Sequence, residues 1–289
     1  IVLMKLTLGF SPCPNDTFIF DAMVNGRIDT EGLEFDYHLA DVEELNKMAF
    51  EPRLDITKIS CHAYAYASSF YFILDSGSAL GYGNGPLLVA RKETSAESLD
   101  KMRIAIPGKY TTANLLLSIA WPEAVNRKEY LFSDIPDAIL SGEADAGLII
   151  HETRFTYRDR GLVKIADMGD FWEKLTGLPI PLGMIVIRRT VNEAAALKVN
   201  RILRRSIEYA MKDPLASSGF VASNAREHDK RVLDNHIGLF VNSFSVELGR
   251  NGRSAISELY RIASEKKVIP PASYEIFLTR DDGNKAGID

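Results

Sequence analysis

The segment from Gly142 to Tyr157 constrains the fold more than any other part of the sequence. It begins with a tight turn, continues as a short apolar run from Ala146 to Ile150, and changes abruptly to polar residues at His151. An apolar run of this length between turn signals predicts a strand buried on both faces, as in the sheets of α/β proteins. Ligands in such folds bind beyond the carboxyl ends of the strands, where His151 is expected to lie.

His151 is therefore a candidate general base. A histidine titrates near pH ~6.5 when unperturbed, and a catalytic one would have to be neutral, reach a cleft, and have its other ring nitrogen held by a fixed partner. Burial would lower the pKa of His151 and the neighbouring Glu152 would raise it, and the sequence does not decide between these effects. By position alone, a histidine after a strand is more often a hydrogen-bonded structural residue.

The rest of the chain alternates strands with helices, and its length of 289 residues exceeds what one compact core usually serves. The sequence therefore predicts two α/β lobes with a ligand cleft between them. We expect residues 1–90 and 185–289, which include the C-terminal helices, to form the first lobe, and residues 91–184 to form the second. A glycine-rich segment at 77–85 would lead out of the first lobe, and a proline-stiffened loop at 178–183 would lead back.

A stiff loop follows the first predicted strand, Met4 to Phe10. Two prolines and the pair Asn15-Asp16 exclude regular structure directly after Ser11, and a helix is predicted from Thr17, with Asn15, Asp16 or Thr17 as its cap. Backbone N–H groups at the start of such a helix would point at whatever lies above the sheet. A plain strand-to-helix turn is the simpler interpretation, but the two stiffening prolines favour a binding role for Ser11, Asn15 and Asp16.

The same arrangement recurs in the second lobe. A predicted strand at 102–106 ends in Pro107-Gly-Lys-Tyr-Thr-Thr-Ala113, and a helix follows. In the first lobe, the strand at 54–60 ends with polar Thr57, Lys58 and Ser60. Hydroxyl and backbone N–H donors at Ser60, Thr111, Thr112 and the Ser11 loop suit a substrate that bears a carboxylate. We therefore expect the carboxylate to be held at 58–60 and 111–113 rather than by an arginine clamp.

Composition narrows the classes of partner. The net charge is −5, and the basic residues are scattered along the sequence, which argues against a nucleic-acid groove. The sequence has neither a secretory signal pattern nor an apolar run of about 18 residues, so no membrane association and a cytoplasmic location are expected. The oligomeric state is left open, a homodimer included. The tail after Thr279 is expected to be frayed.

No cofactor or metal is expected. Cys13 and Cys61 form no CxxC pair and are interpreted as reduced thiols. His151-Glu152 does not continue as HExxH, because residue 155 is Phe, and the other histidines form no recognisable set of metal ligands. The sequence also lacks a P-loop and a G-x-S-x-G motif. The remaining prediction is an acid–base site without metal or nucleotide.

Six motifs then point to one family. They are SPCPNDTF at 11–18, TKIS at 57–60, PGKYTTA at 107–113, GLIIHETRFTY at 147–157, TGLPIPLG at 176–183 and FVNSFS at 240–245. In order and spacing they resemble those of the 1,4-dihydroxy-6-naphthoate synthases, which belong to the futalosine route to menaquinone. The resemblance covers the chain from Met4 to about Leu278.

This resemblance implies a type II periplasmic-binding-protein-like fold that has become a cytosolic enzyme. It implies a lyase that converts cyclic dehypoxanthine futalosine into 1,4-dihydroxy-6-naphthoate. His151 corresponds to the family's general base. The segments that contact substrate correspond to Lys58, Ile59 and Ser60 together with Thr112 and Ala113.

Two alternatives remain at this point. A small-molecule binding protein with the same two lobes would have no chemistry, and fold alone does not exclude it. The absence of a signal pattern and the position of His151 argue for an enzyme. Chorismate dehydratase, an enzyme of the same pathway with the same fold, fits the motifs at 11–18 and 148–152 less well.

Overall fold

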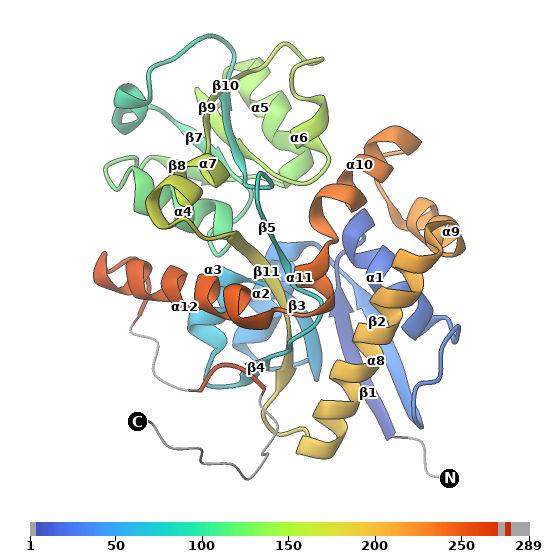
Figure 1. The fold of residues 1–289 in the computed structure, drawn as a ribbon. Coiled ribbons are helices and arrows are strands. Elements are labelled where there is room, and N and C mark those ends of the chain that lie inside the picture. Colours follow the sequence, from blue (N-terminus) through green and yellow to red (C-terminus); the bar gives the residue numbers. More distant parts are fainter. Residues whose placement is uncertain (1–3, 271–274, 279–289) are drawn as a thin grey trace.

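The computed structural model describes residues 4–270 and 275–278 and contains two mixed β-sheets, one above the other in Figure 1. The first sheet has the order β2-β1-β3-β11-β4, and β5 pairs with β11. Its strands are β1 (Met4–Phe10), β2 (Leu33–Leu39), β3 (Ile56–Ser60), β4 (Tyr71–Ile73), β5 (Ala79–Gly81) and β11 (Ile180–Arg188). β1 runs parallel to β2 and β3, whereas β11 runs antiparallel to β3.

The second sheet has the order β10-β6-β9-β7-β8. Its strands are β6 (Leu87–Ala90), β7 (Ile104–Ile106), β8 (Arg127–Glu129), β9 (Ala146–Ile149) and β10 (Val163–Asp167). β7 is parallel to both β8 and β9, and β6 is antiparallel to β9 and β10. The two lobes are defined here by these two sheets.

Helices cover both sheets. Those that belong to the first lobe are α1 (Pro14–Val24), α2 (Val42–Phe50), α3 (Cys61–Ala67), α8 (Glu193–Lys212), α9 (Pro214–Asn224), α10 (Lys230–Phe240), α11 (Ser243–Val246) and α12 (Gly249–Glu265). Those of the second are α4 (Thr112–Ala120), α5 (Ile135–Ser141), α6 (Thr153–Thr156) and α7 (Met168–Thr176), with 3₁₀ turns at Ala96–Lys101 and Phe132–Asp134.

Period-2 alternation along β11 divides the core of the first lobe. Ile185 and Ile187 pack on one face with residues of α1 and α8, whereas Met184 and Val186 pack on the other with residues of α3 and α12. The cluster that contains Met184 and Val186 continues into the second lobe, where it includes residues of α4 and α7. The lobes therefore share one apolar layer on this side, and α5 covers the opposite face of the second sheet.

Each sheet has a point where the strand order reverses, and both points matter for function. In the first sheet, the chain leaves β1 towards β2 and later returns to β3 on the other side of β1. In the second, it leaves β7 towards β8 and returns to β9 on the other side of β7. Loops at such points diverge and leave a crevice, so the segments after β1, β3, β7 and β9 are the natural places for a site.

Several predicted boundaries differ from the structure. α1 begins at Pro14 with Cys13 at the N-cap, so neither Asn15, Asp16 nor Thr17 caps it; proline fits the first helical turn because its missing N–H needs no partner there. β6 pairs in the second sheet, although residues 87–90 were assigned to the first lobe. β11 already begins at Ile180, within the predicted return loop.

That early start of β11 includes a proline. Pro181 pairs with Leu80 of β5 where the register shifts between Pro181 and Gly183, an irregular place of the kind that tolerates proline in a sheet. Whether the two lobes move as separate bodies stays a prediction. The tail predicted to be frayed from Thr279 lies outside the described residues.

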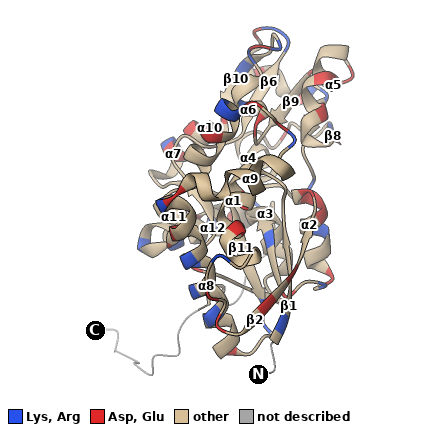
Figure 2. Cartoon of the chain, turned by 90° about the vertical axis from the view of Figure 1, so that its right-hand side faces the viewer, with Lys and Arg blue, Asp and Glu red and all other residues tan. Residues whose placement is uncertain are grey.

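The surface carries charges of both signs. Lys and Arg are interspersed with Asp and Glu over the elements in Figure 2. Many of them pair, as Lys5 does with Asp36 between β1 and β2 at 3.0 Å. Within the described residues, no helix combines the length and the apolar character needed to cross a membrane.

Gly85, at the crossing between the lobes, provides a test of this packing. A Cβ there would overlap the backbone of Gly169, which has no side chain to move aside. We expect Gly85→Ala to lower the free energy of unfolding by about 1–3 kcal/mol, measured by urea denaturation. Gly219→Ala is the matched control: Gly219 lies in α9 with open space around it, so alanine should stabilise by about 0.5–1 kcal/mol. Equal midpoints for the two variants would contradict this account.

Candidate functional site

A cavity of about 90 Å³ lies at the meeting of the two reversal points. All ten residues that the sequence suggested as catalytic or substrate-binding line this cavity. They come from the end of β3 and from the segments that follow β1, β7 and β9. These residues are Ser11, Asn15, Asp16, Lys58, Ile59, Ser60, Thr111, Thr112, Ala113 and His151. The fold thus brings all of them to one place. Their roles stay predictions, since the cavity shows only that they share a surface.

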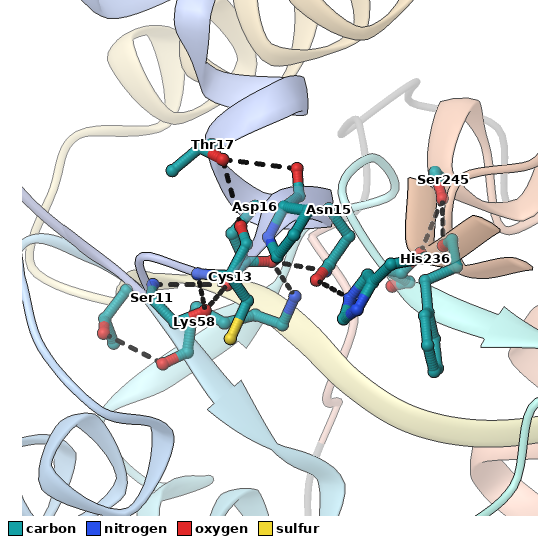
Figure 3. Close-up of polar contacts among 12 residues, drawn as sticks. Ser11, Cys13, Asn15, Asp16, Thr17, Lys58, His236 and Ser245 are labelled. Carbon is teal, nitrogen blue, oxygen red and sulfur yellow. Dashed lines mark hydrogen bonds and ion pairs between the residues drawn. The ribbon is translucent and has the colours of Figure 1, made fainter. Parts of the chain in front are cut away.

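A buried ion pair joins the segments after β1 and β3. Lys58 Nζ lies 2.5 Å from Asp16 Oδ1, and both side chains are less than 10% exposed. The other carboxylate oxygen of Asp16 accepts hydrogen bonds from the backbone N–H and the hydroxyl of Ser11, at 3.2 and 2.7 Å. Figure 3 shows how these side chains converge at the start of α1.

This pair changes the interpretation of the first loop. The sequence suggested that the start of α1 would present N–H groups to an anionic ligand. In the structure, the carboxylate of Asp16 itself occupies the first turn of α1 and takes the N–H of Ser11. Asp16 thus places an internal carboxylate in this first turn, where the helix N-terminus favours a negative charge, and binding of a ligand anion by the loop stays a prediction.

The hydroxyls of the second loop are also used within the protein. Thr111, the N-cap of α4, donates to the carbonyl of Gly108 at 2.8 Å, and Thr112 donates to the carbonyl of Leu182 at 2.5 Å. The backbone N–H groups of Thr112 and Ala113 lie in the first turn of α4, where no intrahelical acceptor exists. These N–H groups, rather than the threonine hydroxyls, are the donors available to a ligand.

Ser60 keeps a free donor and is held by a residue that sequence reasoning missed. Asn46 of α2 accepts the N–H of Ser60 at 2.8 Å and donates to its hydroxyl oxygen at 3.1 Å, which leaves the Ser60 O–H free to donate. Asn46 also donates to Glu43 at 2.9 Å, and Glu43 accepts the N–H of Tyr110 from the second lobe at 3.1 Å. Nothing in the helical pattern of α2 distinguished Glu43 or Asn46 from ordinary helix residues.

His151 lines the cavity in a strained backbone conformation. Its φ is +55°, in the left-handed region that non-glycine residues rarely adopt and that often marks functional sites. Burial lowers the pKa of His151 and outweighs the opposing effects of the carboxylates of Glu152, Asp41 and Asp16. The side chain is therefore neutral at pH 7, the form that a general base requires.

The fixed hydrogen-bond partner predicted for His151 is not found. Its Nε2 is buried without a hydrogen-bond partner. Instead the ring packs between two others. The Phe132 ring lies 4.8 Å away, edge to face, and the His236 ring of α10 is parallel to it at 6.0 Å.

Arg154 also lines the cavity, but both terminal nitrogens of its guanidinium are engaged. They bond to the carbonyls of Gly83 and Gly85 and to the carboxylate of Asp167. Arg154 therefore fixes the glycine-rich crossing rather than forming an open clamp. The glycines there suit this role because they let the backbone approach the guanidinium closely.

One group of potential metal ligands escaped the sequence reasoning. The Cys13 sulfur and ligand atoms of His151 and Glu152 all lie within 4.8 Å of one another, although they come from two lobes. Burial and the nearby carboxylates of Glu152 and Asp16 raise the pKa of the Cys13 thiol well above its ordinary value, so the sulfur is protonated when no metal is bound. The absence of a metal stays a prediction.

Comparison with known proteins gives relatives over nearly the whole chain. A family model described as menaquinone biosynthesis matches residues 6–265. The chain is 42% identical to a 1,4-dihydroxy-6-naphthoate synthase of Thermus thermophilus, over 94% of this chain and 99% of that protein. It is 41% identical to the enzyme of the same name from Streptomyces coelicolor, over 92% and 95% of the two chains.

Solved structures agree on the fold. A protein of Archaeoglobus fulgidus, 37% identical, superposes with a TM-score of 0.87 over 92% of this chain and 98% of its own. An alkanesulfonate-binding protein of Xanthomonas axonopodis pv. citri superposes with a TM-score of 0.69 over 95% and 96% of the two chains, at 13% identity, which shows the fold alone. The predicted two-lobe, periplasmic-binding-protein-like α/β fold is thus confirmed, and the chain belongs to the menaquinone-biosynthesis family.

Proposed function

We propose that this protein is a 1,4-dihydroxy-6-naphthoate synthase that acts on cyclic dehypoxanthine futalosine. The observation that carries the proposal is the position of His151, a neutral, buried histidine in a strained conformation, at a cavity that also collects anion-binding donors. Two relatives above 40% identity carry the name of that enzyme. A binding protein without chemistry would have no need of an unpaired, neutral imidazole at this place.

The chemistry assigned to His151 is proton removal. The imidazole accepts the proton of a hydroxyl in the sugar-derived part of the substrate, a carbonyl forms on that carbon, and the adjacent carbon–carbon bond breaks. The electron pair of that bond passes to the ring system, whose conversion into an aromatic naphthoate favours the forward direction. General-base catalysis by a positioned histidine contributes about 10²–10⁴-fold, and orientation within the cavity supplies more.

Opening and closing of the lobes is part of the proposal. The cavity of about 90 Å³ is smaller than the roughly 300–1,000 Å³ of typical ligand sites, so the substrate enters only after the lobes separate. Contacts between the lobes, such as Thr112 to Leu182 and Tyr110 to Glu43, would break and reform in each cycle.

The reaction itself is the first test. Incubating the purified protein with cyclic dehypoxanthine futalosine should give 1,4-dihydroxy-6-naphthoate, detected by mass spectrometry, without added metal or cofactor. Chorismate should not be consumed in a parallel incubation. Tight binding of the futalosine derivative with no product would favour the binding-protein alternative, and turnover of chorismate would favour the dehydratase.

Ser60→Ala tests how the substrate carboxylate is held. We place the carboxylate against the free O–H of Ser60, the ammonium of Lys58 and the N–H groups of α4. A hydrogen bond to a charged group contributes about 1.5–3 kcal/mol, so KM should rise about 10-fold or more while kcat changes little. Ser217→Ala is the control, since Ser217 is equally buried but does not line the cavity. An unchanged KM in Ser60→Ala would place the carboxylate elsewhere.

His151→Asn tests the base. Asparagine tolerates the positive φ at this position better than most residues, so the fold should persist and substrate should still bind. We expect turnover to fall by at least about 10²-fold, measured with thermal unfolding as a check on folding. Turnover close to that of the unsubstituted protein would show that the base lies elsewhere.

The pH profile provides a second measurement on the same residue. Because burial lowers the pKa of His151, the neutral base persists below the ordinary value of about 6.5. Activity should therefore stay constant from pH 7.5 to about 6.5 and fall only at lower pH, as the imidazole takes up a proton. A fall that begins above pH 7 would mean that Glu152 outweighs burial.

A further inference from the structure

His236 is a fully buried histidine whose protonation is set by a chain of hydrogen bonds. Asp16, paired with Lys58, can only accept, so the Asn15 atom 2.8 Å from it must be the amide nitrogen. The amide oxygen of Asn15 therefore faces His236 Nε2, at 2.9 Å, and Nε2 must carry the proton. Figure 3 shows this chain running from Lys58 to His236.

The second nitrogen of His236 carries no proton in the neutral form. Burial, and after it the charge of Lys58, lowers the pKa of His236 well below its ordinary value. Nδ1 is buried and has no hydrogen-bond partner. Asn15 thus holds the ring in one tautomer, and Phe240, with ring centroids 4.7 Å apart, packs against it and restrains its plane.

This fixed ring lies against the proposed base. The planes of His236 and His151 differ by only 7°, and the two residues come from different lobes. His151 Nε2 has no hydrogen-bond partner, and the ring is restrained by packing between Phe132 and His236. An aromatic ring without a hydrogen bond could provide contact area at this position, but its edge would not be anchored to the Lys58–Asp16–Asn15 chain.

We propose that His236 is a positioning residue. The Lys58–Asp16–Asn15 chain holds the His236 ring, and in the proposed closed state that ring packs against His151 and sets the orientation of its imidazole. This inference rests on the proposed function in so far as His151 is the base of that reaction. It assigns His236 no contact with the reacting atoms. The groups that act electrostatically on His151 are Glu152, Asp41, Asp16 and Lys58.

Two substitutions separate the ring from its hydrogen bond. His236→Phe keeps an aromatic ring but loses the bond to Asn15, and we expect kcat to fall roughly 5- to 10-fold. His236→Ala also removes the ring, and a displaced base should lower kcat about 10²-fold. KM should stay within about threefold in both, since neither change touches the donors assigned to the substrate. Leu233→Ala, a buried change one turn earlier in α10, controls for lost packing and should leave kcat unchanged.

A titration of the free protein gives a readout that does not depend on turnover. The chain has five histidines, and the His151 ring signal is identified in NMR spectra by its loss in His151→Asn. In His236→Ala, water enters beside His151, so its pKa should rise towards about 6.5. It should stay low in His236→Phe and in Leu233→Ala. The pH below which kcat falls should rise with this pKa in His236→Ala and stay unchanged in the other two variants.

The outcomes distinguish the two proposals. If the pKa of His151 rises in His236→Ala but the unsubstituted protein does not convert the futalosine derivative, the proposed function fails, and what stands is that His236 packs on His151 and keeps water from it. If the unsubstituted protein is active and His236→Ala, shown to be folded, keeps both its kcat and the low pKa of His151, the positioning role is overturned. An equal loss of kcat in Leu233→Ala would also overturn it, because general packing would then account for the effect.

Discussion

The buried ion pair between Lys58 and Asp16 is the constraint on which the site depends. Removing an ion from water costs several kcal/mol, so a buried pair persists only when its remaining hydrogen-bonding capacity is satisfied. Asp16 meets this condition with bonds from Ser11, Asn15 and Lys58. The pair therefore fixes the loop after β1 against the end of β3, and through Asn15 it also fixes helix α10.

Charge neutralisation by this pair determines what the rest of the cavity can do. With Asp16 and Lys58 paired and His151 neutral, the proposed substrate carboxylate would meet two dipolar donors, the Ser60 hydroxyl and the first turn of α4, beside the paired ammonium of Lys58. Such donors keep a fixed direction and need no reorganisation when charge develops during a reaction. A neutral imidazole beside them can take a proton without first losing one.

The two lobes contact one another through polar groups and through apolar groups. Polar contacts between the lobes converge at the cavity, as in Tyr110 to Glu43 and Thr112 to Leu182. Apolar contacts lie to one side, where residues of α3, α4, α7 and α12 share one cluster. The polar contacts can exchange with water when the lobes part, whereas the apolar cluster would lose stabilisation in proportion to the area exposed. In the proposed opening, the hinge would therefore lie on the apolar side.

The sequence by itself determined the α/β class, the two lobes and ten residues that the fold collects at one cavity, because strand ends followed by Pro, Gly and hydroxyl residues are local patterns. It did not determine which donors remain free. The hydroxyls of Thr111 and Thr112 both donate to backbone carbonyls, and the carbonyl that Thr112 bonds to, that of Leu182, is 70 residues away in the chain. Nor did the sequence assign roles to Asn46 and His236, which become significant only through partners distant in the chain. The pKa direction of His151 likewise depended on the tertiary structure, because burial and the distances to carboxylates from both lobes exist only once the lobes have packed together.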